Sequence, residues 1–92
     1  MTEPYVKDPY DKEDFGVNYY DWIGSDTISV STWTVSPTGP TLSADAINNT
    51  TKVTTTFVEG GTHGVDYTLT NSITTATGLK KRRSILIQVK SQ

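Results

Sequence analysis

A segment of β-branched residues around a tryptophan, residues 27–35, places the strongest constraint on how this chain folds. It reads Thr-Ile-Ser-Val-Ser-Thr-Trp-Thr-Val, a composition that suits a pleated strand and disfavours a helix. Its apolar residues keep one parity up to Val30 and the other from Trp33 onward. A strand keeps its buried face through such a change only if an extra residue is inserted. We therefore predict one bent strand with a β-bulge near residues 31–32.

The rest of the composition indicates an all-β fold. Threonine supplies 17 of the 92 residues, whereas helix formers such as Ala, Leu, Glu and Gln are scarce. Trp33 is expected at the centre of the core, because no other side chain can bury as much apolar area. The chain has no cysteine, which excludes disulfides, thiolate nucleophiles and thiolate metal ligands.

The length and hydropathy of the chain predict one small domain that is made in a cytoplasm. Ninety-two residues fit one domain of marginal stability. No apolar run approaches the roughly 18 residues of a membrane span, and the N-terminus lacks the apolar region of a signal peptide. We therefore expect no membrane association.

Six segments with alternating apolar residues are separated by turn residues. The turns are rich in Gly and Pro and lie at 36–40, 59–64 and 76–78. Short strands at this spacing are typical of a β-sandwich. The predicted strands are residues 15–21, 27–35, 42–46, 51–58, 65–73 and 83–89.

The segment Val-Asp-Tyr-Thr-Leu-Thr at 65–70 follows a Gly-rich turn and resembles a tyrosine corner. In that motif a tyrosine near the start of the penultimate strand bonds its hydroxyl to upstream backbone. An ordinary core tyrosine at Tyr67 is the alternative. Together with a buried tryptophan on an early strand, the pattern predicts a single immunoglobulin-like or fibronectin-III-like antiparallel β-sandwich.

Residues 1–14 contain two prolines, many charges and no sustained period, which predicts an extended N-terminal arm. The sandwich domain is then expected over residues 15–92. Tyr5, Val6 and Tyr10 are the apolar residues of this arm and are expected to contact a partner protein. The alternative is a disordered tail.

The two ends of the chain carry opposite charges. Residues 1–26 hold seven acidic side chains against Lys7 and Lys12, whereas residues 80–92 hold five basic side chains and no acid. If the first and last strands lie side by side, each end can neutralise the other within one chain or between copies. The strongest charge run is Lys80, Lys81, Arg82 and Arg83.

This basic run does not predict nucleic-acid binding. The chain has a net charge of −2, and no aromatic residue follows Tyr67 to provide a stacking platform. On a strand, alternate members of the run face opposite sides, so they cannot form one flat basic patch. We expect the run to protect a sheet edge or to contact acidic neighbours.

No catalytic, cofactor-binding or metal-binding residues are predicted. His63 is the only histidine, and it lies in a Gly-flanked turn without an orienting partner or nucleophile at a suggestive spacing. The turn at 60–64 lacks the Gly-Lys-Ser/Thr ending of a phosphate loop and leads into a strand. Acidic residues cluster in the arm but do not match a calcium loop.

Several motifs in order resemble a family of small tailed-bacteriophage virion proteins, the fiber–tail adaptors. They are Lys-Asp-Pro at 7–9, Asp-Trp-Ile-Gly at 21–24, Asp-Thr-Ile at 26–28, Ser-Thr-Trp-Thr-Val at 31–35, Gly-Val-Asp-Tyr-Thr-Leu-Thr-Asn at 64–71 and Ile-Thr-Thr-Ala-Thr-Gly at 73–78. The resemblance covers nearly the whole chain. It departs from the family in its longer arm, rich in Tyr and charges, and in its fully basic run at 80–83.

The resemblance implies a non-enzymatic immunoglobulin-like structural protein of the virion, assembled in the host bacterial cytoplasm. Its partners would be a tail or neck adaptor, the tail fiber and copies of itself around the tail. The residues expected to bind partners are Tyr5, Val6, Tyr10, Lys80, Lys81, Arg82 and Arg83.

Two other functions remain open at this point. One is a capsid decoration or a module that binds carbohydrate or a host surface, through aromatic residues that could equally be core. These aromatics are Tyr19, Tyr20 and Trp22. The other is a stand-alone hydrolase, which would be supported by turnover that depends on His63.

Overall fold

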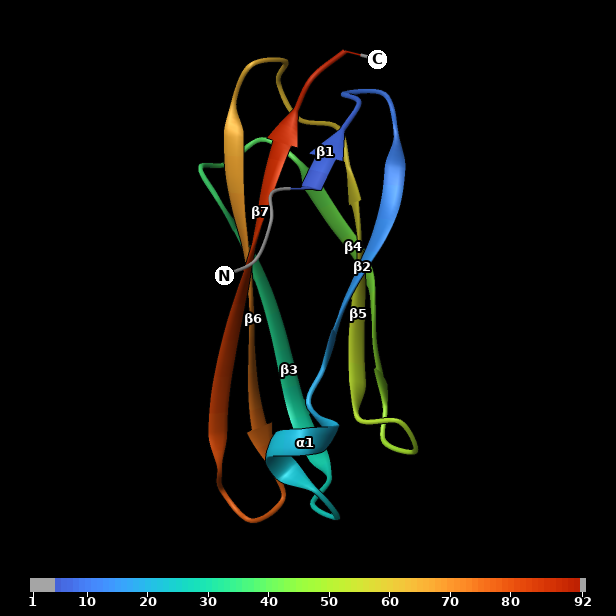
Figure 1. The fold of residues 1–92 in the computed structure, drawn as a ribbon, viewed down its shortest axis with the longest axis vertical. Coiled ribbons are helices and arrows are strands. Elements are labelled where there is room, and N and C mark those ends of the chain that lie inside the picture. The colour runs from blue at the N-terminus through green and yellow to red at the C-terminus, as the bar shows by residue number, and fades with distance from the viewer. Residues whose placement is uncertain (1–4, 92) are drawn as a thin grey trace.

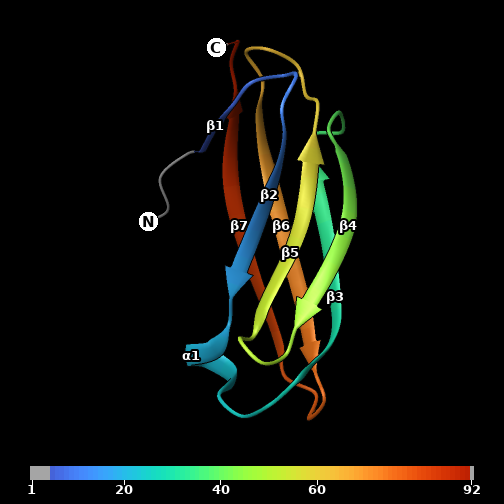
Figure 2. The same ribbon diagram turned by 90° about the vertical axis from the view of Figure 1, so that its right-hand side faces the viewer.

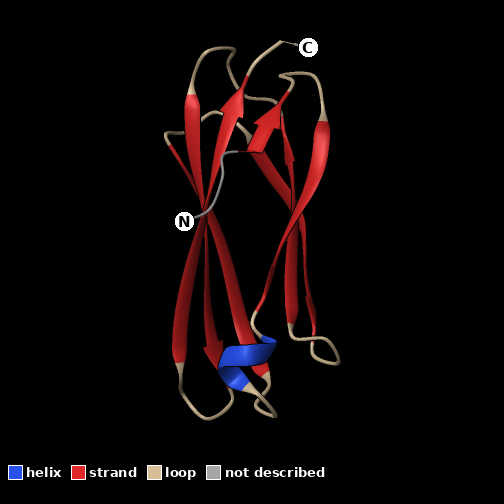
Figure 3. Ribbon diagram, viewed as in Figure 1, coloured by secondary structure: helices blue, strands red, loops and turns tan. Residues whose placement is uncertain are grey.

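The computed structural model describes residues 5–91, which form seven strands and one helical turn (Figures 1 and 3). Residues 1–4, the start of the predicted arm, and residue 92 lie outside the described residues. The elements are β1 (Tyr5–Lys7), β2 (Lys12–Asn18), α1 (Tyr20–Ile23), β3 (Ile28–Ser36), β4 (Thr41–Asn48), β5 (Val53–Glu59), β6 (Asp66–Thr75) and β7 (Lys80–Val89).

The strands form two packed sheets, which confirms the predicted all-β sandwich. One sheet has the order β1-β7-β6-β3 and the other has the order β2-β5-β4 (Figure 2). Every pairing is antiparallel except that of β1 with β7. Among the described residues, no helix has the length and hydrophobicity needed to cross a bilayer.

The sandwich is elongated, with extents of 42 × 27 × 19 Å. We call the end that carries α1 and the β6–β7 hairpin the lower end (Figure 1). The upper end carries the β1–β2 turn, the β5–β6 loop and the C-terminal end of β7. The candidate binding residues are divided between these two ends.

The core is formed by side chains that point inward from both sheets. Trp33 is 7% exposed, as predicted for a core residue, while Tyr19 and Tyr67 are the largest side chains that are almost fully buried. One parity of each of the first and fifth predicted strands is buried, except that Val65 is half-buried. The buried residues are Phe15, Val17 and Tyr19, and Tyr67, Leu69, Asn71 and Ile73.

The bulge in β3 exists, but its predicted place near residues 31–32 is wrong. The register shifts between Ile28 and Val30, so Val30 points outward and is 52% exposed. The side chain of Asn49 accepts from the Ile28 amide at 2.7 Å and donates to its carbonyl at 3.2 Å. This side-chain amide pairs both backbone groups of Ile28 next to the register shift, and it lies 21 residues away in sequence.

The second sheet buries threonines of β5 and leaves the largest apolar residue of that strand outside the core. Thr54, Thr56 and Val58 are fully buried, whereas Phe57 is 38% exposed. The Thr56 hydroxyl donates to Asp45 Oδ1 at 2.6 Å, so the buried polar group is satisfied.

The predicted alternation along the third strand is interrupted by a second register shift. This shift lies in β4 between Ser43 and Ala46, and Ala44 adopts a φ of 55°. The irregular backbone brings Asp45 to the Thr56 hydroxyl of β5. The strand therefore contributes a polar contact at the position where a regular apolar face was expected.

The first predicted strand, 15–21, ends earlier than expected. The chain leaves β2 at Asn18 and forms α1, with Ile23 N–H donating to Tyr19 O at 3.1 Å and Gly24 N–H to Tyr20 O at 2.9 Å. The Asn18 side chain accepts from the Tyr20 amide at 2.9 Å and competes with continued strand pairing. This helical turn directs Ile23 into the core.

The tyrosine corner predicted at Tyr67 is confirmed. Its hydroxyl accepts a hydrogen bond from the backbone N–H of Thr62 at 3.0 Å, five residues upstream. A Cβ atom added at Gly39 would lie 2.9 Å from this hydroxyl oxygen. A glycine is therefore needed where the β3–β4 connection passes the corner.

Residues 5–14 were expected to extend away from the domain, but they are incorporated into both sheets. β1 pairs with β7 through Tyr5–Ile87 and Lys7–Val89, and β2 begins at Lys12. The expected domain boundary at residue 15 therefore falls inside β2. The reason is tertiary, because β1 covers an otherwise open edge of β7.

Candidate partner-binding surfaces

The seven predicted contact residues separate into two groups along β7. Tyr5 lies beside Ile87 near the upper end, whereas the basic run begins β7 at the lower end. Lys80 lies seven positions from Ile87 and Arg83 lies four, which correspond to about 23 Å and about 13 Å of strand. The cations at the start of the run are therefore too far from Tyr5 to form one compact site with it.

The upper group is exposed but does not share one face. Tyr5 is 42% exposed; its ring packs edge-on against Phe15 at 4.9 Å, and its hydroxyl donates to Glu13 Oε1 at 2.7 Å. This hydrogen bond to Glu13 is the main reason that the pKa of Tyr5 is raised. Val6 has the opposite parity and is 45% exposed, and Tyr10 is 90% exposed in the β1–β2 turn.

Lys7 holds this upper group in place, a role that sequence reasoning missed. Its side chain is 1% exposed, and Nζ donates to the carbonyls of Asp8 at 2.9 Å and Gly60 at 2.7 Å. It thereby joins β1 to the loop that follows β5. Nothing in the local sequence distinguishes this lysine from a solvated one.

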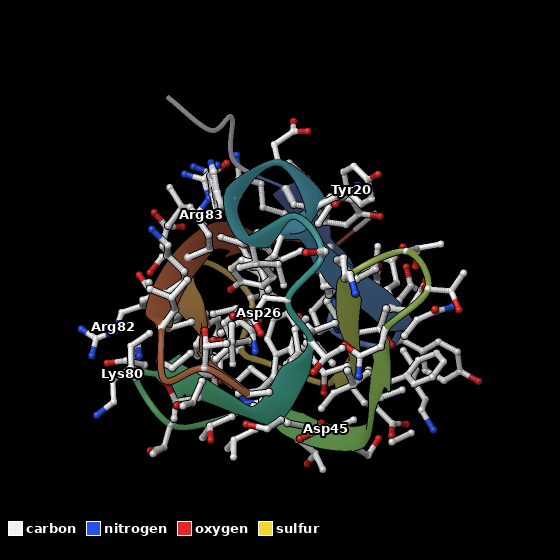
Figure 4. All side chains as sticks on the ribbon, turned by 90° about the horizontal axis from the view of Figure 1, so that it is seen from below. Tyr20, Asp26, Asp45, Lys80, Arg82 and Arg83 are labelled. Atoms are coloured by element: carbon white, nitrogen blue, oxygen red, sulfur yellow. The ribbon has the colours of Figure 1, made fainter. Side chains whose placement is uncertain are left out.

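The basic run divides between two sides of the molecule, as its strand position predicted. Figure 4 shows Lys80 and Arg82 together on one side, with Arg83 turned toward α1 and Tyr20. Lys80 and Arg82 line a hollow of about 360 Å³ on the outer face of β3, β6 and β7. The hollow also contains Lys81 and is lined by Val30, Thr32, Ser72, Ile73 and Thr74.

Arg83 stacks on an aromatic ring. Its guanidinium carbon lies 4.2 Å from the centroid of Trp22, which is 41% exposed on α1. A cation placed over an indole in this way is stabilised by the negative face of the ring. The sequence separation of 61 positions gave no signal for this pair.

The three aromatics considered as a carbohydrate platform do not lie together on the surface. Tyr19 is fully buried, and its hydroxyl donates to Asn71 Oδ1 at 2.9 Å. Burial raises the pKa of Tyr19 to about 12. Tyr20 and Trp22 remain exposed, but Arg83 covers one face of the Trp22 ring.

Sequence reasoning also missed the outer face of β2, β5 and β4. Phe57 is exposed there, and Lys12 Nζ lies 5.4 Å from its ring centroid. A shallow hollow of about 760 Å³ lies farther along this face and is lined mainly by Asn, Thr and small apolar side chains. The alternation of Val53, Thr55 and Phe57 indicated a strand but did not indicate which of its sides faces outward.

The geometry around His63 offers no chemistry beyond a hydrogen bond. His63 Nδ1 accepts from the Ser91 backbone N–H at 2.9 Å and so helps to hold the end of the chain. Within residues 5–91, no group of three His, Asp or Glu side chains is placed to hold a metal ion. The described surface therefore offers protein-contact groups: exposed aromatics, cations and hydroxyls.

Comparison with solved structures supports the fold. The chain matches the solution structure of the PKD domain from KIAA 1837 protein with a TM-score of 0.59 and 19% sequence identity. The match covers 100% of this chain and 85% of that domain. At this identity the likeness concerns the fold alone. No curated protein matches the chain significantly.

Comparison with protein families gives a match over nearly the whole sandwich. The model described as podophage GP4 fiber-tail adaptor protein gp77 matches residues 7–88. The matched region begins at the buried Lys7 of β1 and ends one residue before the end of β7. It therefore includes both sheets and the whole basic run.

Proposed function

We propose that this chain joins tail fibers to the tail or neck of a bacteriophage particle, because it belongs to the podophage GP4 fiber-tail adaptor protein family. Membership implies a structural protein of the virion that binds other virion proteins such as the tail fiber. The match over residues 7–88 carries this proposal, since it spans nearly the whole sandwich.

The adaptor would act by protein–protein contacts and without catalysis. It would assemble in the host bacterial cytoplasm, with several copies around the tail. The exposure of the predicted contact residues supports this role, because Tyr, Trp and Arg are the side chains that dominate binding at protein interfaces. The proposed contacts are Tyr5, Val6 and Tyr10 at the upper end and Lys80, Lys81, Arg82 and Arg83 at the lower end.

A phage that lacks this gene provides the test when the protein is supplied from a plasmid. Particles formed without the protein should lack tail fibers, and the wild-type protein should restore both its own band and the fiber band. Normal fiber content in particles without the protein would overturn the proposal.

Substitutions test the upper contact residues better than truncation does, because deleting residues 1–14 would remove β1 and the start of β2. Tyr10→Ser combined with Val6→Ser changes exposed side chains and should reduce incorporation into particles. Thr68→Ala is a matched control on the exposed side of β6. Equal incorporation of both variants would remove the upper group from the proposed interface.

A second candidate function, a surface module that binds carbohydrate, is favoured by one observation. Tyr20 and Trp22 are 55% and 41% exposed and lie two positions apart on α1. Aromatic faces of this kind can bind apolar faces of a ligand. A glycan array with the isolated domain discriminates: the adaptor should bind none, whereas binding that is lost in Trp22→Ala would support the module.

A further inference from the structure

Charge is unevenly distributed between the two ends of the sandwich, although Asp21 and Asp26 also lie at the lower end. The lower end carries the basic run that begins β7, and the acidic residues of the β1–β2 turn and β2 lie toward the upper end, where β2 pairs with the end of β5. The acidic side chains of this upper region are Asp8, Asp11, Glu13, Asp14 and Glu59. One chain therefore presents complementary surfaces that are far apart.

The two groups do not neutralise one another within the described chain. Neutralisation within one chain was expected if the first and last strands lie side by side. β1 does lie beside β7, but it pairs only with residues 87–89, which are distant from Lys80, Lys81 and Arg82. Within residues 5–91, the charged groups of Lys80, Lys81 and Arg82 have no carboxylate at ion-pair distance. A carboxylate of another molecule can therefore neutralise these cations.

The hollow beside the cations suits a carboxylate. Arg82 offers a planar fork that can bind a carboxylate through two hydrogen bonds, and Lys80 adds a mobile ammonium. The hydroxyls of Thr32, Ser72 and Thr74 line the same hollow and can donate further hydrogen bonds. Val30 supplies apolar surface at its edge. Carboxylates on an extended segment would meet all three kinds of group.

The acidic upper region presents such a segment. Asp14 is exposed on β2, which is an edge strand of its sheet, and Asp11 is half-buried in the preceding turn. Lys12 and Glu13 lie between them. Glu13 accepts the hydrogen bond from Tyr5, and Lys12 is an exposed cation whose Nζ lies over the ring of Phe57, so the segment has three acidic side chains and one basic one. Because the segment is fixed by pairing of β2 with β5, its carboxylates are presented with little further loss of conformational entropy.

We propose that copies of this chain associate end to end, with the basic hollow of one copy receiving the acidic 11–14 segment of the next. Different surfaces meet in this contact, so it builds a ring or an open filament rather than a two-fold dimer. The inference rests on the proposed function only in placing repeated copies around a tail. The contact itself should also form between purified copies of the protein, without other virion components.

Charge reversals test the contact by sedimentation velocity at low salt. Wild-type protein should associate with rising concentration, and added salt should weaken the association. Arg82→Glu and Asp14→Lys should each weaken it about tenfold or more, because each variant places like charges together. An equimolar mixture of the two variants should associate again, since unchanged surfaces then meet and the two reversed charges also complement each other.

Lys90→Glu is the matched control, because it makes the same change in net charge as Arg82→Glu at the opposite end of β7. It should associate like the wild type. Circular dichroism and thermal unfolding should show that all variants keep the fold. A monomeric wild type, normal association of Arg82→Glu, or a mixture that stays monomeric would each overturn the proposed contact.

Phage particles separate this inference from the adaptor role. If Arg82→Glu enters particles normally and fibers still depend on the protein, the end-to-end contact fails and the adaptor function stands. If particles without the protein keep their fibers, the adaptor function fails whatever the sedimentation result.

Discussion

Asn71 connects the two sheets through its side chain. Its Oδ1 accepts from the hydroxyls of Tyr19 at 2.9 Å and Thr54 at 2.6 Å, and its Nδ2 donates to Ser31 Oγ at 2.9 Å and Thr32 O at 3.2 Å. Asn71, Tyr19 and Thr54 are all fully buried. A satisfied network of this kind fixes one arrangement of the sheets, because any other arrangement leaves buried donors unpaired.

Replacing Asn71 by alanine should lower the free energy of unfolding by about 2–4 kcal/mol, since two buried hydroxyls lose their acceptor. Urea denaturation measures this loss. Thr68→Ala, on the exposed side of the same strand, is the control and should change stability little.

A double-mutant cycle distinguishes loss of the hydrogen-bond network from simple loss of packing. The double variant Tyr19→Phe with Asn71→Ala should lose less stability than the sum of the single variants, because removing the hydroxyl removes the unpaired donor. Strictly additive effects would contradict the proposed role of this hydrogen bond.

At the scale of elements, the lower end is held by contacts between the β6–β7 hairpin and the connection from α1 to β3. Thr77 Oγ1 donates to Asp26 Oδ2 at 2.5 Å, and the Ala76 N–H donates to Thr27 O at 2.8 Å. The hydrogen bond from the Thr77 hydroxyl is the main reason that the pKa of Asp26 is lowered, followed by that from Thr75. The contact therefore favours the ionised carboxylate.

The pH dependence of this contact follows from the lowered pKa. The native state releases the Asp26 proton more readily than the unfolded chain, so the contact stabilises the fold above the ordinary aspartate pKa of 3.8 and is lost as the pH falls through the lowered value. In Thr77→Val, the carboxyl titration of Asp26 followed by NMR should move up toward 3.8. The same midpoint in both proteins would contradict this assignment.

At the scale of the whole molecule, the central strands of the two sheets have partners on both sides, and the edge elements do not. β6 pairs with β3 and β7, and β5 pairs with β2 and β4. β1 contributes only three residues at an edge. A small domain with this organisation should open from its edges, because few bonds and little buried area are lost there.

Amide hydrogen exchange should follow this organisation. The slowest amides are expected in β6, around Leu69 and Ile73, and the next slowest in β5. Amides of β1 and α1 should exchange at least about tenfold faster, since edge elements open without unfolding of the core. Protection in β1 equal to that in β6 would show instead that the first strand is part of the central cooperative unit.

Local sequence patterns were enough to predict the class of fold and much of the core. The alternation through Tyr67, Leu69, Asn71 and Ile73 sufficed to predict β6, because periodicity reports which side of a strand is buried. The turn before Tyr67 likewise indicated the tyrosine corner. These features are local, since the residues that produce them lie within one strand and its preceding turn.

Contacts between residues distant in sequence determine where polar residues replace apolar ones in the core and which surfaces remain exposed. The bulge at Ile28 depends on Asn49, the buried face of β5 depends on Asn71 and Asp45, and Lys7 depends on the Gly60 carbonyl. Each partner is distant in sequence, so no local pattern can encode the pairing. The sequence showed that the two ends of the chain carry opposite charges. The pairing of β1 with the far part of β7 places the acidic residues around the β1–β2 turn away from the basic run, whereas Asp21 and Asp26 lie at the same end as that run.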